Sequence, residues 1–189
     1  MRTFEADGVP HRTRDLCAYD QFHLLRLILP VLPAVIALDL DTAALDPEII
    51  TSALGGIEQA QIKAAFEAAA GAVEREDDGN WRPATKAVPL HDMLTIVLAA
   101  VDANFSDYLS RQQPAFKPMP QPLPMWKPVT MPEGESWLFR PCLSEPPLLD
   151  MLSLFDGRAN LFQVAKANDL LDVMAENEVR ATAKPIGRP

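Results

Sequence analysis

Cysteine is nearly absent from this chain of 189 residues, which contains only Cys17 and Cys142. The two cysteines lie far apart in the sequence and form no C-x-x-C pair, so a disulfide framework is not expected. Disulfides persist mainly in secreted and extracellular proteins, because intracellular thiols are kept reduced. The cysteine content therefore indicates a cytosolic protein.

Basic residues are also scarce. Lysine and arginine number 17 against 26 aspartates and glutamates, and the formal net charge is −9. Residues 1–112 hold 17 of the acids and nine of the bases, which gives them a net charge of −8. An acidic body repels phosphate groups, so we expect no nucleic acid among the partners. Such a surface favours solubility and suits partners with basic or exposed apolar segments.

No hydrophobic run is long enough to cross a membrane. The most apolar stretch, Leu24–Leu38, is shorter than the roughly 20 residues of a transmembrane helix, and it contains Arg26, Pro30 and Pro33. The N-terminal residues MRTFEADGVPH are charged and lack the apolar segment of a secretory signal peptide. We therefore expect no membrane partner and interpret Leu24–Leu38 as buried core.

Catalytic and cofactor motifs are missing as well. His11, His23 and His91 show no H-E-x-x-H or other paired metal-ligand spacing. The sequence also contains no G-x-S-x-G, no phosphate-binding loop and no G-x-G-x-x-G motif. Cys17 and His23 have the residue types of a nucleophile and its base, but the sequence suggests no third residue to orient the base.

Two acidic clusters have simpler explanations than metal binding or catalysis. Asp39 and Asp41 resemble the start of a calcium loop, but alanines occupy the next ligand and turn positions. We interpret the acids of residues 74–78 as the solvated end of a helix, since nothing apolar surrounds them to separate their pKa values. We expect a protein without enzymatic activity, metal or cofactor.

Helical patterns dominate what the sequence does contain. Apolar spacing and cap signals predict four helices in residues 1–112, beginning near residues 18, 46, 57 and 90. The third should continue to residue 76, and residues 81–89 should form a loop. Pro30 and Pro33 should end or kink the first helix, because each lacks an amide donor.

A short β-hairpin should precede these helices, because the Asp7-Gly8 pair is a turn signal. The fold class is therefore mainly α, with a small helical domain over residues 1–112 that begins with a hairpin. We expect this domain to fold alone, since its helices supply complementary apolar faces.

Proline is concentrated in one segment, where seven of the chain's 18 prolines fall within residues 113–134. This spacing favours an extended, polyproline-II-like arm that reaches up to about 70 Å. The arm also carries Phe116, Met119, Leu123, Met125, Trp126 and Met131. Exposed apolar side chains lower solubility unless something covers them. Three interpretations stay open: the arm packs on its own helical domain, a partner recognises it, or its composition has no role.

Residues 135–189 predict a second, small helical module. The segment around Trp137 and Arg140 is interpreted as an aromatic anchor, and a brief helix is expected from Pro146 to Asp156. Asn160 should cap a last helix. The apolar residues that roughly share one face of that helix are Leu161, Val164, Leu171 and Met174.

The arm and the anchor supply the candidate partner-binding residues, because Trp, Met and Arg are frequent anchors of protein interfaces. The candidates are Phe116, Met119, Met125, Trp126, Trp137 and Arg140. Trp126 is the largest apolar group on the arm. Which half of the chain binds which partner stays open.

A run of the pattern R-T-x-x-L-x-A-x-x-Q-F-H lies within Phe4–Pro33 and leads into a helix that bears an arginine. This run resembles the opening of the tail assembly chaperones of tailed bacteriophages. The matching positions are Arg12, Thr13, Leu16, Ala18, Gln21, Phe22, His23 and Arg26. The helical remainder to about residue 112 is similar to the family in length and order.

The C-terminal residues carry a second resemblance, to a small phage protein that is often encoded directly after such a chaperone. The resembling positions are Trp137, Arg140, Pro141, Asp156, Gly157, Asn168, Asp169, Leu171, Asp172, Glu176 and Asn177. Together the two resemblances cover nearly the whole chain outside the arm. The proline-rich arm therefore looks like the seam between two phage modules.

These resemblances imply a function in phage tail assembly. Such chaperones coat the tape-measure protein and recruit tail-tube subunits in the host bacterial cytoplasm, and then leave before the tail is complete. In many of these systems a short form and a frameshifted, extended form act together, so a shorter form or a second copy is a further candidate partner. Two other classes stay open: a small acidic adaptor or secretion-type chaperone with unrelated clients, and a hydrolase with a scattered site.

Overall fold

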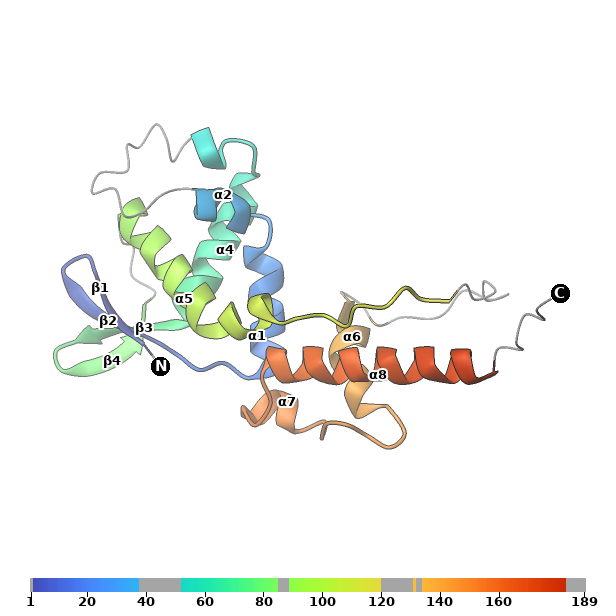
Figure 1. The fold of residues 1–189 in the computed structure, drawn as a ribbon. Coiled ribbons are helices and arrows are strands. Elements are labelled where there is room, and N and C mark those ends of the chain that lie inside the picture. Colours follow the sequence, from blue (N-terminus) through green and yellow to red (C-terminus); the bar gives the residue numbers. More distant parts are fainter. Residues whose placement is uncertain (1, 38–51, 85–88, 120–130, 132–133, 183–189) are drawn as a thin grey trace.

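The computed structural model describes residues 2–37, 52–84, 89–119, 131 and 134–182 of the chain. Helices dominate these residues, and a small antiparallel sheet lies at one end of the molecule (Figure 1). The mainly α fold predicted from the sequence is therefore confirmed. The predicted helix start near residue 46 lies outside the described residues. Within them, no helix has both the length and the hydropathy that a membrane span requires.

The sheet consists of two hairpins. In the first, β1 (Thr3–Ala6) pairs with β2 (Val9–Thr13), as the sequence predicts. In the second, β3 (Val73–Asp77) pairs with β4 (Asn80–Pro83). Strands β2 and β3 are antiparallel neighbours, so the order across the sheet is β1-β2-β3-β4.

Both hairpins turn at an Asp-Gly pair in which both residues have positive φ. The φ angles are 52° and 64° at Asp7 and Gly8, and 49° and 77° at Asp78 and Gly79. A type I′ turn needs this conformation at both central positions, and its twist matches that of the flanking strands. The same dipeptide therefore closes both halves of the sheet.

The second hairpin corrects the predictions for residues 72–83. Helix α4 (Gln59–Gly71) ends before residue 76, and β4 occupies part of the expected loop. The alanine-rich composition favours a helix only up to Gly71, and beyond it the Asp-Gly turn and pairing with β2 favour a strand. The acids of residues 74–77 therefore lie on β3 rather than at a helix end. Glu74 accepts a hydrogen bond of 2.6 Å from Nε of Arg12 on β2.

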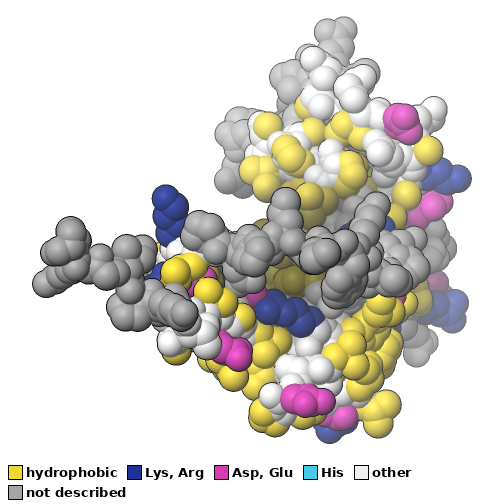
Figure 2. All heavy atoms as spheres, turned by 90° about the vertical axis from the view of Figure 1, so that its right-hand side faces the viewer, with side chains coloured by type: hydrophobic (Ala, Val, Ile, Leu, Met, Phe, Trp, Pro, Cys, Tyr) yellow, Lys and Arg dark blue, Asp and Glu magenta, His cyan; other side chains and the backbone are white. Residues whose placement is uncertain are grey.

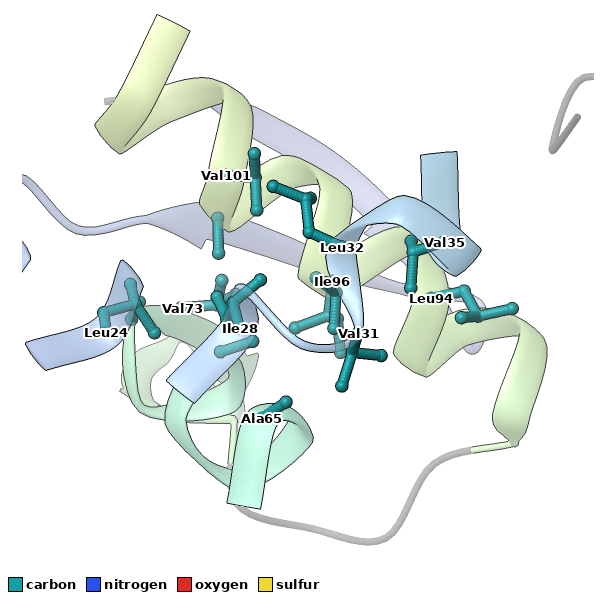
Figure 3. Close-up of a cluster of buried hydrophobic side chains, with 14 of the residues drawn as sticks. Leu24, Ile28, Val31, Leu32, Val35, Ala65, Val73, Leu94, Ile96 and Val101 are labelled. Carbon is teal, nitrogen blue, oxygen red and sulfur yellow. The ribbon is translucent and has the colours of Figure 1, made fainter. Parts of the chain in front are cut away.

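The helices α1 (Ala18–Ile28), α2 (Leu32–Ala37), α4 and α5 (Leu90–Ser110) pack around one hydrophobic core. Pro30 lies between α1 and α2 and so separates two helices, as predicted. Figure 3 shows side chains of α1, α2 and α5 pointing toward one another, with Ala65 of α4 at the edge of the cluster. Small residues on α4 allow it to lie close to both α1 and α5.

The C-terminal part contains α6 (Glu135–Phe139), the 3-10 turn η2 (Arg140–Cys142), α7 (Ser153–Asp156) and α8 (Leu161–Thr182). The helix expected from Pro146 begins only at Ser153. The amides of Leu148 and Leu149 donate instead to the carbonyl of Pro141, at 2.9 and 3.4 Å, which holds this segment as a loop. The predicted end at Gly157 is confirmed.

Asn160 caps α8 as predicted. Its Oδ1 accepts a hydrogen bond of 3.0 Å from the amide of Gln163, whose Oε1 accepts one of 2.8 Å from the amide of Asn160. This reciprocal pair satisfies amides that a helix start otherwise leaves unpaired. The predicted apolar face holds only in the first half of α8, since Leu161 and Val164 are buried whereas Met174 is 49% exposed.

We expect replacement of Gly79 by alanine to lower the free energy of unfolding by about 1 kcal/mol, because φ at this position is in the left-handed region. Urea unfolding followed by circular dichroism measures the effect. Gly71→Ala is the matched control, since it ends a helix and nothing lies within 4 Å of an added Cβ. The free energy of unfolding of Gly71→Ala should equal or exceed that of the wild type. Equal stability of Gly79→Ala and the wild type would contradict the turn assignment.

Candidate protein-binding site

The first part of the proline-rich arm runs along α8 (Figure 1). The central contact is Glu176, whose two carboxylate oxygens each lie 3.2 Å from the amide nitrogen of Met119. Arg180, one turn further along α8, donates to Glu176 at 2.7 Å and to the carbonyl of Lys117 at 3.3 Å. The hydrogen bond from Arg180 holds the pKa of Glu176 below its usual value, so the carboxylate stays charged at neutral pH.

Two further contacts tie the residues directly before the arm to the first half of α8. Nε of Arg111 lies 3.5 Å from Oδ2 of Asp169, and both side chains are largely buried. Nζ of Lys166 donates to the carbonyl of Gln112 at 3.3 Å. Residues 166, 169, 176 and 180 recur at helical spacing and so share one face of α8. The arm thus begins as a strap along that face.

The candidate residues on the arm fall into two groups. Phe116 and Met119 are half-buried in this strap. Met125 and Trp126 lie outside the described residues. The partial burial of the first group and the hydrogen bonds of Met119 and Lys117 to α8 are compatible with the interpretation that the arm folds back on its own chain.

Trp137 lies between the two halves of the chain. Its ring stacks on Phe22 of α1 with centroids 6.3 Å apart, and meets Tyr108 of α5 edge-on at 6.5 Å. Its carbonyl accepts a hydrogen bond of 3.0 Å from Nδ2 of Asn168 on α8. The indole is half-buried and packs against both hydrophobic clusters of the protein.

Arg140 borders a shallow apolar groove of about 540 Å³ on the C-terminal part. Its Nη1 donates to Asp172 at 2.6 Å and also lies 3.4 Å from Oδ1 of Asn168, and its side chain is 40% exposed. The groove is lined by Met131, Ser136, Arg140, Leu143, Ser144 and Leu171. Leu143 is a strongly exposed lining residue, with 68% of its surface accessible.

Hydrophobic side chains are plentiful on the face toward which the C-terminal end of α8 points. Figure 2 shows them above, below and within a hollow in the middle of this face. The exposed apolar residues of the C-terminal part include Leu143, Met151, Leu152, Phe155, Leu170 and Met174. A surface of this composition is typical of protein binding.

A second groove, of about 400 Å³, lies between α1 and α4. His23 is on its rim, where Nε2 is 3.3 Å from a carboxylate oxygen of Glu135 and the ring packs against Tyr19 at 4.4 Å. Cys17 begins α1, and its Sγ accepts a hydrogen bond of 3.4 Å from the amide of Asp20. Burial raises the pKa of the Cys17 thiol, so it stays protonated at neutral pH and is a poor nucleophile.

Within the ranges that the structure describes, no three His, Cys, Asp or Glu side chains are grouped so as to hold a metal ion. The described residues offer apolar grooves, charged contacts between the arm and α8, and exposed hydrophobic side chains. Such features are typical of surfaces that bind other proteins.

Buried hydrogen bonds connect α1 and α5 to the start of α8, and they were not predicted from the sequence. Oε1 of Gln21 accepts a hydrogen bond of 2.6 Å from the amide of Leu161, and Nε2 of Gln21 lies 3.4 Å from Oδ1 of Asn104. Gln21 is one of the positions that resemble phage chaperones, but that resemblance gives it no structural role. The sequence feature that could have indicated this connection is a glutamine among the apolar residues of an amphipathic helix.

We expect Glu176→Ala to release the arm from α8, because the amide of Met119 loses its acceptor. Hydrogen exchange at Met119 should become several-fold faster, as measured by NMR or mass spectrometry. Glu178→Ala is the control, because it removes an exposed carboxylate from the same helix two residues away. Unchanged exchange at Met119 in Glu176→Ala would show that the strap does not depend on this carboxylate.

A family model described as "phage tail assembly chaperone protein, TAC" matches residues 7–116, more than half of the chain. No curated protein and no solved structure shows significant similarity to the chain. The matched segment contains strands β2, β3 and β4, the helices α1, α2, α4 and α5, and the start of the arm, whereas β1, α6, α7 and α8 lie outside it. The chain therefore belongs to the phage tail assembly chaperone family.

Proposed function

We propose that this member of the phage tail assembly chaperone family binds the tape-measure protein and tail-tube subunits while the tail is built. It would act in the host bacterial cytoplasm and be absent from the finished tail. The family match over residues 7–116 is the observation that carries this proposal. A protein that holds clients during assembly needs apolar surface, enough net charge to stay soluble, and contacts that can be exchanged.

The chain has these three properties. Its formal net charge is −9, and large apolar side chains are exposed on the C-terminal part. Two of the polar contacts that hold the arm and the residues before it to α8 come from the exposed side chains of Arg180 and Lys166, and such exposed contacts are individually weak. Binding without a catalytic step also agrees with a family whose members are chaperones.

We propose that the chain consists of a helical domain over residues 1–112, an arm over residues 113–134 and a C-terminal module over residues 135–189. We place the client-binding half in the arm and the C-terminal module. The groove beside Arg140 supports this placement, because it joins apolar side chains to a partly exposed guanidinium. Arginine and apolar anchors together are typical of interface centres. A client segment with an apolar residue and a nearby carboxylate fits this groove.

Co-expression with the tape-measure protein and the major tail protein of the same phage tests the function itself. The chaperone should co-purify with one or both clients. Mass spectrometry of purified phage particles should then detect the clients but not the chaperone. Failure to capture either client would contradict the proposal, and stoichiometric amounts of this chain in finished tails would contradict its role as a transient chaperone.

Two leucines with equal exposure test the groove. Leu143→Asp places a charge in the groove, whereas Leu152→Asp places one on another part of the same module, at 68% and 67% exposure in the wild type. We expect Leu143→Asp to weaken client capture by a factor of roughly 30, the effect of losing an anchor worth about 2 kcal/mol. Leu152→Asp should weaken capture far less, because Leu152 is not among the residues that line the groove. Equal binding by both variants would remove the groove from the client site.

The arm has a test of its own. We expect the double variant Met125→Ala, Trp126→Ala to weaken client capture without lowering the melting temperature, because an extended segment loses little conformational entropy when it docks. The competing interpretation, in which Trp126 packs on its own domain, forecasts a lowered melting temperature with client capture intact. A pull-down and a melting curve of the same variant distinguish the two.

A further inference from the structure

Helix α8 holds the end of the strap by its backbone. Nη2 of Arg180 donates to the carbonyl of Lys117 at 3.3 Å. Both carboxylate oxygens of Glu176 lie 3.2 Å from the amide nitrogen of Met119. The side chains of Lys117 and of Pro118, which stands between the two contacts, are exposed. Two side chains of α8 therefore bind one carbonyl and the amide of the second residue after it.

These two side chains of α8 are also joined to each other. Nε of Arg180 donates to Oε1 of Glu176 at 2.7 Å, and the two residues are one helical turn apart. Glu176 is only 6% exposed, although glutamate is seldom buried unless it is paired. Its partners are a guanidinium and a backbone amide, which compensate a carboxylate for the loss of water. The pair therefore places an acceptor and a donor side by side in a fixed arrangement.

The spacing of this acceptor and donor fits an extended peptide. In an extended chain, the carbonyl of one residue and the amide of the second residue after it point to the same side. A helical segment does not fit, because the amides and carbonyls inside a helix are already bonded to each other. The residue in between needs no amide hydrogen, and Pro118 takes this place in the strap. Phe116 and Met119 are half-buried, so apolar side chains fit at these two positions.

The strap follows α8 over most of the length of the helix. It begins at Gln112, whose carbonyl accepts a hydrogen bond of 3.3 Å from Nζ of Lys166. An extended chain advances about 22 Å from residue 112 to residue 119, and an α-helix advances about 21 Å from residue 166 to residue 180. The similar lengths agree with an extended strap that runs in the same direction as α8 (Figure 1). A segment as short as residues 112–119 therefore fills this face.

We propose that this face of α8 is a binding site for extended peptide segments, and that the arm occupies it as an internal ligand until a segment of a client displaces the arm. Main-chain hydrogen bonds supply the affinity in this mode of recognition, so segments of different sequence fit. A short tether gives the chain's own arm an effective concentration near millimolar, which keeps the site closed to weak ligands. That a client supplies the displacing segment rests on the proposed function, whereas the site itself does not.

Met119→Pro separates the site from its internal ligand. Proline has no N–H group, so the arm loses its hydrogen bond to Glu176 while the side chains of α8 stay unchanged. Both neighbours of Met119 in the sequence are prolines, so a further proline agrees with an extended arm. Ala115→Pro is the matched control, because it adds the same ring at an exposed position of the arm and leaves the amide of Met119 in place.

The probe is a fluorescein-labelled peptide with the sequence of residues 112–120, and fluorescence polarisation measures its binding to the full-length variants. Met119→Pro should bind the peptide about tenfold more tightly than the wild type or Ala115→Pro, because the competing arm has lost a hydrogen bond to a charged group. A second peptide carries N-methylmethionine at the position of Met119 and so lacks only the amide hydrogen. It should bind Met119→Pro about tenfold more weakly than the first. Adding Glu176→Ala to Met119→Pro should abolish the difference between the two peptides.

Three results of these measurements would overturn the proposal. Equal binding of the first peptide by Met119→Pro and Ala115→Pro would show that the arm does not occupy the site of the peptide. Equal binding of the two peptides by Met119→Pro would show that the amide is not recognised. Absence of binding to Met119→Pro at about 1 mM peptide would show that the arm is not a ligand, because its effective concentration in the chain is near this value.

Client capture tests the displacement separately from the site. Met119→Pro should capture a co-expressed client about tenfold more tightly than Ala115→Pro, for the same reason that it binds the peptide more tightly. Equal capture by the two variants, with the peptides binding as expected, would overturn the assignment of the displacing segment to a client. Capture of no client by any variant would contradict the proposed function, and the peptide measurements would still decide whether α8 carries the site.

Discussion

The arrangement of the whole chain depends on one buried amide, the side chain of Gln21. It is 6% exposed, and its oxygen accepts from the first residue of α8 while its nitrogen faces Asn104 of α5. Asn104 in turn accepts from the amide of Leu16 at 3.2 Å and donates to the carbonyl of Ala100 at 3.0 Å. A buried polar group without a partner costs about 1–3 kcal/mol, so each member of this chain of hydrogen bonds fixes the others. The position of α8 relative to α1 and α5 follows from it.

Once its start is fixed, α8 divides into two functional halves. The first half is buried at Leu161, Val164, Ala165 and Asn168 and completes the hydrophobic clusters. The second half leaves the body of the protein, and Leu170 and Met174 become about half exposed. This projecting half lies beside the arm, so a single helix joins the stable core to the segment that we assign to client binding (Figure 1).

Local signals in the sequence predicted what is local in the structure. Pro30 ends α1, Asp7-Gly8 turns the first hairpin and Asn160 caps α8, and in each case the cause lies within a few residues. The second hairpin was missed although Asp78-Gly79 carries the same turn signal, because an alanine-rich helix runs up to it and its partner strand β2 is about 60 residues away. The contact between Gln21 and Leu161 spans 140 residues, and no spacing in the sequence reports it.

The contacts within the chain also differ in how readily they break. The strap contacts of Arg180 and Lys166 come from exposed side chains, where salt and water weaken them, whereas Glu176 is only 6% exposed. The contacts of Leu161 and Ala18, which join the two halves of the chain, are buried from water, and the core around Ile28 and Phe105 is also fully buried. The arm should therefore detach first, the module second, and the helical core last. This order suits a protein that holds partners for a limited time, because its outer contacts open while the core that carries them stays folded.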